Sequence, residues 1–153
     1  MITIVQFVAL VLTALSMSVY FGTWITERPM RRTQSGAVFI ESQQGRDLVA
    51  ARVMPALGNA AIVFVGIGVF FARISSAAFA ILLAGLIFII GDMVVTLTCN
   101  VPINREVQSW QADSPPAEWK QVRDRWEMFH SIRTLLIVLG FNLFAASVVF
   151  FEL

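Results

Sequence analysis

One histidine and one arginine, three residues apart, are the side chains of this sequence best suited to acid–base chemistry. His130 is the only histidine, and imidazole is the side chain that gains and loses a proton near neutral pH. Arg133 follows one helical turn later, and its fixed charge can bind an anionic or enolate-like oxygen. Both residues also have structural interpretations: a lone histidine can serve packing, and an arginine can anchor a helix end at a membrane interface.

Three earlier residues share a helical face with this pair. Trp119, Arg123, Trp126, His130 and Arg133 follow one another at spacings of four, three, four and three, which places them on one side of a helix. We therefore count Trp119 and Arg123 as candidate substrate-binding residues. An interfacial helix with tryptophans at the headgroup level and arginines against anionic lipid explains the same pattern, although it gives His130 no role. A capping Ser114, followed by Pro115 in the first turn, predicts where this helix begins.

A second polar group lies inside the apolar segments. Asp92 precedes Thr98 by six residues, or roughly 9 Å along a helix. Ionisable side chains in membrane spans are costly, and they usually face the bundle interior or a cavity. Asn59 and Tyr20 fall at a similar depth in the two preceding spans, so the three are predicted to converge as substrate-binding residues. Alternatively, Asp92 bonds to a neighbouring helix or pairs with an arginine.

The elements that must position these residues are membrane-spanning helices. The chain of 153 residues is 58% hydrophobic and 14% charged, whereas soluble domains have about 45–50% apolar and about 25% charged residues. A spanning helix needs about 20 apolar residues. Spans are predicted over about 2–25, 53–72, 75–98 and 134–151, with a tight turn at 73–75 and with polar connections over 26–52 and 99–133.

The predicted fold is an all-α, integral-membrane four-helix bundle, formed by a single domain over residues 1–153. We expect an interfacial helix in the connection between the third and fourth spans. The stretch at 35–54 is too short in apolar residues for a span, so it is predicted to be a surface helix or a re-entrant piece. The first apolar run has no preceding basic residue and no small-residue cleavage site, so it is interpreted as a span and not as a signal peptide.

The distribution of charge predicts an orientation and excludes one class of partner. All but one of the 11 lysines and arginines lie in the two long connections, which places these connections in the cytoplasm and both termini outside the plasma (inner) membrane. A net charge of +1 argues against a nucleic-acid surface. The bilayer is the predicted partner. Small residues in the spans would serve a homo-oligomer or internal packing equally well.

A metal site has one partial signal. Glu127 and His130 have the i, i+3 spacing of carboxylate metal sites in helical bundles, but such sites use two copies of this element and further carboxylates. The chain has one copy, no second histidine and the single cysteine Cys99. We therefore predict no metal and no cofactor.

The residues from Asn100 to Arg133 resemble a known family in their order. The segment Asn100-Val101-Pro102-Ile103-Asn104 is followed by Trp110, by Trp119-x3-Arg123-x-Arg125-Trp126 and by His130-x2-Arg133-Thr134. Phe21-Gly22-Thr23-Trp24 and Met54-Pro55-Ala56-Leu57 add weaker similarities. This pattern is similar to that of the anthrone oxygenase-like family of small four-span membrane proteins.

The resemblance implies an activity and a set of residues. Characterised relatives oxidise anthrones to anthraquinones with O2 and without an obvious bound cofactor, so the implied ligand is a hydrophobic aromatic small molecule. His130 would deprotonate a phenol or an anthrone carbon, and the anion would then react with O2 directly. Arg133 and the asparagines would stabilise that anion. The resemblance carries catalytic roles onto Asn100, Asn104, Trp126, His130 and Arg133.

Three functions remain open at this level. A cofactor-independent oxygenase acting on a membrane-soluble aromatic predicts a cavity lined by His130, Arg133 and an asparagine. A non-enzymatic accessory or a small-molecule- or lipid-binding membrane protein predicts that these residues bond to one another. A proton-coupled transporter element predicts a polar path from Asp92 to the opposite face.

Overall fold

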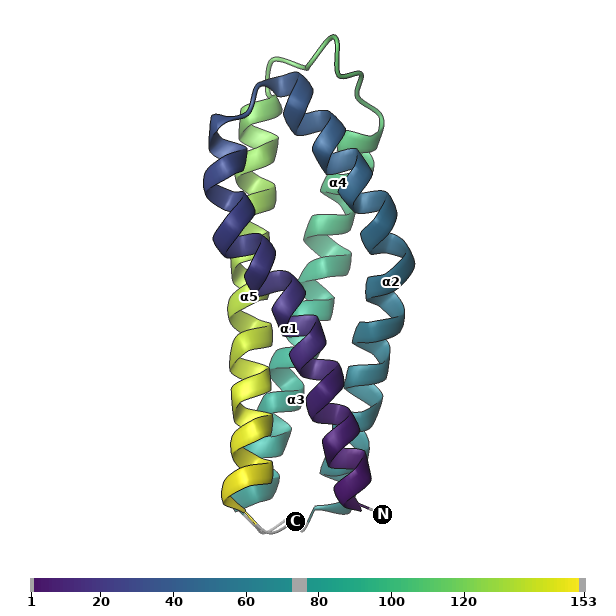
Figure 1. The fold of residues 1–153 in the computed structure, drawn as a ribbon, viewed down its shortest axis with the longest axis vertical. Coiled ribbons are helices and arrows are strands. Elements are labelled where there is room, and N and C mark those ends of the chain that lie inside the picture. Colours follow the sequence, from purple (N-terminus) through teal and green to yellow (C-terminus); the bar gives the residue numbers. More distant parts are fainter. Residues whose placement is uncertain (1, 73–76, 152–153) are drawn as a thin grey trace.

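The computed structural model describes residues 2–72 and 77–151, and the chain is helical through nearly all of this length. The predicted turn at 73–75 lies outside the described residues. Within them, four helices are long and apolar enough to cross a membrane, which confirms the all-α membrane bundle. The elements are α1 (Ile2–Thr33), α2 (Gly36–Phe71), α3 (Ala77–Val95), the π-helical turn η1 (Thr96–Asn100), α4 (Val101–Gln108) and α5 (Trp119–Phe150) (Figure 1).

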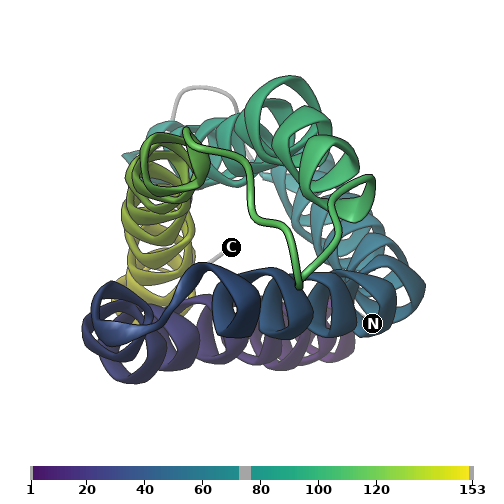
Figure 2. The same ribbon diagram turned by 90° about the horizontal axis from the view of Figure 1, so that it is seen from above.

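The helices alternate in direction around a closed four-sided bundle. Helix α1 packs against α2 and α5, while α3 packs against the same two neighbours from the other side (Figure 2). The segments α3, η1 and α4 follow one another as one long helical rod. The first turn of α1 and the last turn of α5 lie at one end of the bundle, and the connection between α4 and α5 crosses the other end.

The helices are longer than the predicted spans. Helix α1 has 32 residues and α2 has 36, which corresponds to about 48 and 54 Å at 1.5 Å per residue, against about 30 Å of hydrocarbon. The additional turns come from the predicted polar connections. A helix continues through polar residues when its inner face is packed against its neighbours. The length of an apolar run therefore predicts how much of a helix crosses the hydrocarbon and not where the helix ends. These two helices are therefore longer than the hydrocarbon thickness, and their additional turns lie at the polar end of the bundle.

Two predicted elements are continuations of spans. The stretch at 35–54 forms the N-cap and the first half of α2 and not a separate surface or re-entrant piece, because Ser35 accepts a hydrogen bond from Val38 N and begins the long helix there. The interfacial helix is likewise not confirmed as a separate element, since residues 119–133 run into the fourth span within α5.

The predicted start of that last helix at Ser114 is wrong. Helix α5 begins at Trp119, and Glu118 occupies the cap position without a side-chain cap. Ser114 lies instead in a turn and donates its N–H to Gln111 O at 3.2 Å. The loop that follows is packed over the bundle end, where a Cβ added to Gly36 would meet Pro115 Cβ at 2.8 Å. This close packing holds the two prolines outside the helix.

Two apolar cores lie on either side of a polar layer. The membrane half contains a cluster of residues from all four long helices: Ala9, Val65, Leu82, Ile89, Ile137 and Phe144. The polar half contains a second cluster: Phe39, Ile40, Ile103, Val107, Val122 and Trp126. Counting about 20 residues from the apolar end places the hydrocarbon boundary near Gly22, Arg52, Thr96 and Ser131. The polar layer lies at this boundary.

Candidate functional site

An ion pair between α3 and α5 forms the membrane-side floor of the polar layer. The buried Arg133 donates from Nε to Asp92 Oδ1 at 2.9 Å and from Nη2 to Tyr20 Oη at 2.7 Å. Its guanidinium also lies 4.6 Å from the centre of the Tyr20 ring. Because Asp92 compensates the charge of Arg133, the pair ties α1, α3 and α5 together at the boundary.

Three residues were predicted to converge because they lie at a similar depth in their helices, and the structure brings only two of them together. The structure brings Asp92 and Tyr20 onto the same arginine, whereas Asn59 is exposed on α2 and hydrogen-bonds to no described residue. Counting along a helix gives the height of a side chain and not the side toward which it points. Asn59 therefore does not belong to the group around Arg133.

His130 has one nitrogen engaged and one without a partner. Its Nε2 lies 3.0 Å from Thr23 Oγ1, which in turn lies 2.9 Å from the carbonyl oxygen of Val19. With the single hydroxyl hydrogen of Thr23 on a carbonyl of its own helix, the threonine oxygen accepts from His130 Nε2–H. This arrangement favours the Nε2–H tautomer. The other nitrogen, Nδ1, is then an unprotonated acceptor, and it is buried without a hydrogen-bond partner.

Aromatic rings hold the imidazole on two sides. The His130 ring stacks on Trp126 at 4.9 Å with an interplanar angle of 21°, and it meets the Tyr20 ring edge-on at 6.2 Å. On the membrane side of Arg133, the core is apolar. The indole N–H of Trp126 donates to Asn104 Oδ1 at 2.7 Å. The ring position of His130 is therefore set by neighbours from α1, α4 and α5.

Asn100 enters the same layer through a distortion of its helix. Pro102 has no N–H, and its ring would collide with the carbonyl of Thr98 in a regular α-helix. The wider π turn of η1 lies across this point, where Val101 N–H donates to Thr96 O. Such turns frequently occur at functional sites. Asn100 Nδ2 donates to Trp126 O at 3.3 Å, while its Oδ1 is buried without a hydrogen-bond partner.

Three hydrogen bonds hold the side-chain amide of Asn104. Its Oδ1 accepts from Trp126 Nε1 and from Gln43 Nε2 at 3.1 Å, and its Nδ2 donates to Asp47 Oδ1 at 2.6 Å. The amide thereby joins α2, α4 and α5. With its acceptor and a donor hydrogen so used, Asn104 is connected to His130 through the indole of Trp126.

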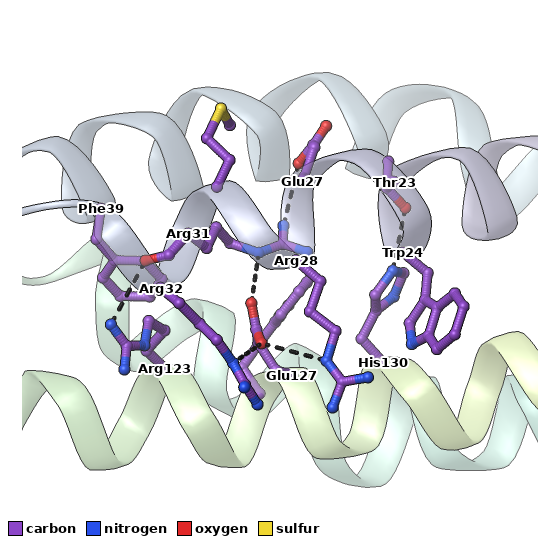
Figure 3. Close-up of polar contacts among 12 residues, drawn as sticks. Thr23, Trp24, Glu27, Arg28, Arg31, Arg32, Phe39, Arg123, Glu127 and His130 are labelled. Carbon is purple, nitrogen blue, oxygen red and sulfur yellow. Dashed lines mark hydrogen bonds and ion pairs between the residues drawn. The ribbon is translucent and has the colours of Figure 1, made fainter.

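A charged layer lies on the outer side of His130 (Figure 3). Glu127 Oε1 accepts from Arg31 Nε at 2.9 Å, and Arg31 Nη1 donates to Glu27 at 3.0 Å. Glu27 also pairs with Arg46 at 2.7 Å. Arg31 is fully buried and lies 4.7 Å from the Trp126 ring centre. The carboxylate that had the metal-site spacing with His130 is thus bound by arginine. Among the described residues, no group of three His, Cys, Asp or Glu side chains could hold a metal ion.

Trp119 and Arg123 lie at the outer end of this layer. Trp119 stacks on Phe39 at 5.9 Å, and Arg123 lies 5.2 Å from the Trp119 ring centre. Arg123 also donates to Arg31 O at 3.4 Å and pairs with Asp124. They precede His130 by eleven and seven residues, or about 16 and 10 Å along the helix. They therefore lie at the outer end of the bundle and not beside the histidine.

Besides the predicted Tyr20, two α1 residues contact the site or its neighbours and were not among the predicted site residues: Thr23 and Arg31. Thr23 was placed in a weak flanking motif, and Arg31 was treated as part of a polar connection after the first span. The Glu27–Arg31 spacing of four residues is a helical ion-pair signal that would have extended α1 past the apolar run. Nothing in the local sequence indicates that Thr23 bonds a histidine 107 residues away.

Comparison with known protein families gives a match. A model of the family described as anthrone oxygenase matches residues 47–143, which include Asp92, Asn100, Asn104, His130 and Arg133. The α1 residues Tyr20, Thr23 and Arg31 precede the matched region. No curated protein and no solved structure matches the chain significantly.

Proposed function

The chain belongs to the anthrone oxygenase family, and from this premise we propose that its site deprotonates a membrane-soluble phenol or anthrone for oxidation by O2 without a bound cofactor. The observation that carries this proposal is the buried, unpartnered Nδ1 of His130, on a ring whose other nitrogen is held by Thr23. A buried acceptor that lacks a donor matches a ligand that brings one. Asn100 Oδ1 is a second such acceptor beside Trp126.

The proposed reaction begins with proton transfer to His130. The Nδ1 lone pair removes a proton from the acidic carbon of the substrate, and Nε2–H keeps its bond to Thr23, so the ring needs no rotation. The carbanion adds O2 to give a peroxide, which takes the proton back from His130. Loss of water then leaves a new carbonyl, so that an anthrone and O2 become an anthraquinone and water. The histidine returns to its neutral form.

The sequence predicts that Arg133 and the asparagines stabilise the negative charge on the substrate oxygen, but we assign this stabilisation to a different group. Arg133 is paired with Asp92, and its Nη2 donates to Tyr20 Oη. This bond makes the Tyr20 hydroxyl a stronger donor, and that hydroxyl belongs to the ring that meets His130 edge-on. We assign the oxygen contact to Tyr20 and a positioning role to Arg133. Asn104 and Trp126 likewise position the imidazole.

The depth of the site supports the same substrate class. His130, Tyr20 and Thr23 lie within a few residues of the estimated hydrocarbon boundary. A polycyclic phenol partitions to this depth, with its rings in the hydrocarbon and its hydroxyl groups at the polar side. The substrate therefore has no need to cross an aqueous phase to reach Nδ1.

A second candidate function rests on a specific observation. Several predicted site residues bond to one another: Arg133 to Asp92 and Tyr20, and Asn104 to Trp126. Such mutual satisfaction favours a non-enzymatic accessory or small-molecule-binding protein. The transporter hypothesis has less support. The described buried hydroxyls of the membrane half, those of Thr13, Ser16 and Ser147, bond to their own helices.

Turnover of an anthrone distinguishes the two candidates. Vesicles containing the full chain are supplied with anthrone, and O2 uptake and anthraquinone formation are followed against protein-free vesicles. We expect a catalysed rate that H130F, which keeps an aromatic ring on Trp126 but removes the base, returns to the background. Wild-type protein with no rate above background on anthrones or phenols, or H130F with an undiminished rate, would contradict the enzymatic proposal.

We also infer that the polar end of the bundle faces the cytoplasm at the plasma (inner) membrane. The arginines of the charged layer, Arg105 of α4 and Arg123 and Arg125 of α5 belong to this end, and cytoplasmic loops carry the excess of basic residues. A reporter that is active only outside the cytoplasm, fused to the C-terminus, is expected to be active. Activity of a reporter that works only in the cytoplasm, fused at the same position, would reverse the orientation.

A further inference from the structure

An open groove of about 350 Å³ runs along the outer face of α1 and α5. Its polar part is lined by Arg28, Arg32 and Glu127, and its other part by Met128 and Ile132. The last two side chains are among the exposed large hydrophobics of the bundle. One groove thus joins a cationic end to an apolar end.

The two arginines of this groove have unused hydrogen-bond donors. Figure 3 shows Arg28 and Arg32 approaching Glu127 from α1, but they stay 3.7 and 3.9 Å from its Oε2. The other oxygen of Glu127 is bound by Arg31. Neither Arg28 nor Arg32 donates a hydrogen bond to a residue that the structure describes, and Arg28 Nε is buried without a partner.

The acidic residues nearby do not neutralise the groove. Glu127 is shared among Arg28, Arg31 and Arg32. Asp124, the other acidic residue of the lining, is paired with Arg123 at 2.8 Å. The groove therefore keeps a positive excess, and its unused N–H groups can bind an anionic acceptor.

The groove lies at the height of lipid headgroups. Arg28 is six residues beyond the estimated boundary at Gly22, which corresponds to about 9 Å along α1. The headgroup layer occupies roughly the first 5–8 Å outside the hydrocarbon, and an arginine side chain spans the difference. Ile132 lies next to the boundary residue Ser131 on α5. Arg28 thus reaches the headgroups, Arg32 lies about one turn further out on α1, and the apolar end faces the acyl chains.

We propose that this groove is a binding site for the phosphate of an anionic phospholipid. The guanidinium groups of Arg28 and Arg32 bind the phosphate oxygens, for which the planar fork of arginine is suited. Met128 and Ile132 contact the first carbons of an acyl chain. The apolar end favours a lipid over free phosphate, because a soluble anion would leave these side chains uncovered. This proposal does not depend on the oxidation chemistry.

Lipid retention by the full chain tests the proposal. The protein is purified in detergent with equal amounts of phosphatidylglycerol and phosphatidylcholine, and bound lipids are counted by native mass spectrometry. Wild-type protein is expected to retain phosphatidylglycerol. R28Q/R32Q should bind it about 30-fold more weakly, at about a five- to sixfold factor per arginine. R52Q/R105Q is the matched control, because it removes two exposed arginines that form no ion pair with a described residue.

The outcomes separate the sources of the phosphate. Added inorganic phosphate or glycerol phosphate should leave the retained lipid unchanged. Displacement of the lipid by either anion at millimolar concentration would mean that the groove is a free-phosphate site and would overturn the lipid proposal. Equal retention of the two lipids by wild-type protein, or an equal loss in R52Q/R105Q, would overturn it as well. The wild-type comparison remains decisive if R28Q/R32Q does not fold.

Discussion

Removing the hydroxyl of Thr23 tests whether this residue determines the tautomer of His130. In T23V, the side chain keeps its shape but no longer accepts from His130 Nε2–H, which lies 3.0 Å from Thr23 Oγ1 in the structure. The buried donor then has no partner, at a cost of about 1–3 kcal/mol. The tautomer that carries its proton on Nδ1 becomes competitive, and in that form Nδ1 can no longer act as the base.

The same cost sets the expected loss of rate. A penalty of about 1–3 kcal/mol on the productive tautomer corresponds to a roughly 5- to 150-fold lower kcat, at about 1.4 kcal/mol per tenfold change. KM should change little, because Thr23 does not contact the substrate in the proposed mechanism. T23S retains the hydroxyl and should recover most of the rate. T134V is the matched control, because Thr134 donates to the backbone carbonyl of His130 and not to its ring.

The single histidine makes the tautomer directly observable. In protein labelled with ¹⁵N at histidine, all ring nitrogen signals come from His130. Wild-type protein and T134V should show an unprotonated Nδ1 and a protonated Nε2, and T23V should show a mixture or the reverse. An unchanged tautomer in T23V, or a wild-type ring protonated on Nδ1, would refute the assignment whether or not the protein turns over an anthrone.

Three further predictions concern stability, measured by thermal unfolding of the purified full chain. D92N should lower the free energy of unfolding by about 3–5 kcal/mol, because it leaves Arg133 charged and buried without its partner. D92N/R133Q should recover part of this loss. A D92N protein as stable as the wild type would show that Arg133 finds another anion. G140A should lower the free energy of unfolding by about 1–3 kcal/mol, since a Cβ there would meet Ile89 Cγ1 at 2.7 Å. G66A, with no neighbour within 4 Å, should leave stability unchanged or raise it. Equal effects of the two substitutions would contradict the close approach of α3 and α5. N104A should cost about 1–3 kcal/mol through the unsatisfied indole N–H of Trp126 and should shift tryptophan fluorescence, and an unshifted spectrum would argue against this bond.

The membrane architecture of this protein is largely readable in its sequence. Apolar runs of sufficient length predict four spans because the hydrocarbon has a fixed thickness, and the structure contains four helices that meet this requirement. The order of residues from Asn100 to Arg133 indicated a family that the comparison confirms. Depth counting also brought Tyr20 and Asp92 to one level, because helical rise is nearly constant.

The partners of the polar side chains were decided by the tertiary structure alone. The polar-side limits of α1, α2 and α5 depend on the packing of the polar halves of these helices and not on apolar length. Apolar length alone therefore places Glu27 and Arg31 in a connection, whereas the structure has them in α1. The direction of each side chain around its helix separates the exposed Asn59 from the buried Tyr20 and Asp92. The roles of the site residues stay predictions. The free nitrogen of His130 could not have been foreseen, because it depends on a hydroxyl that only the packing of α1 against α5 brings within hydrogen-bond distance.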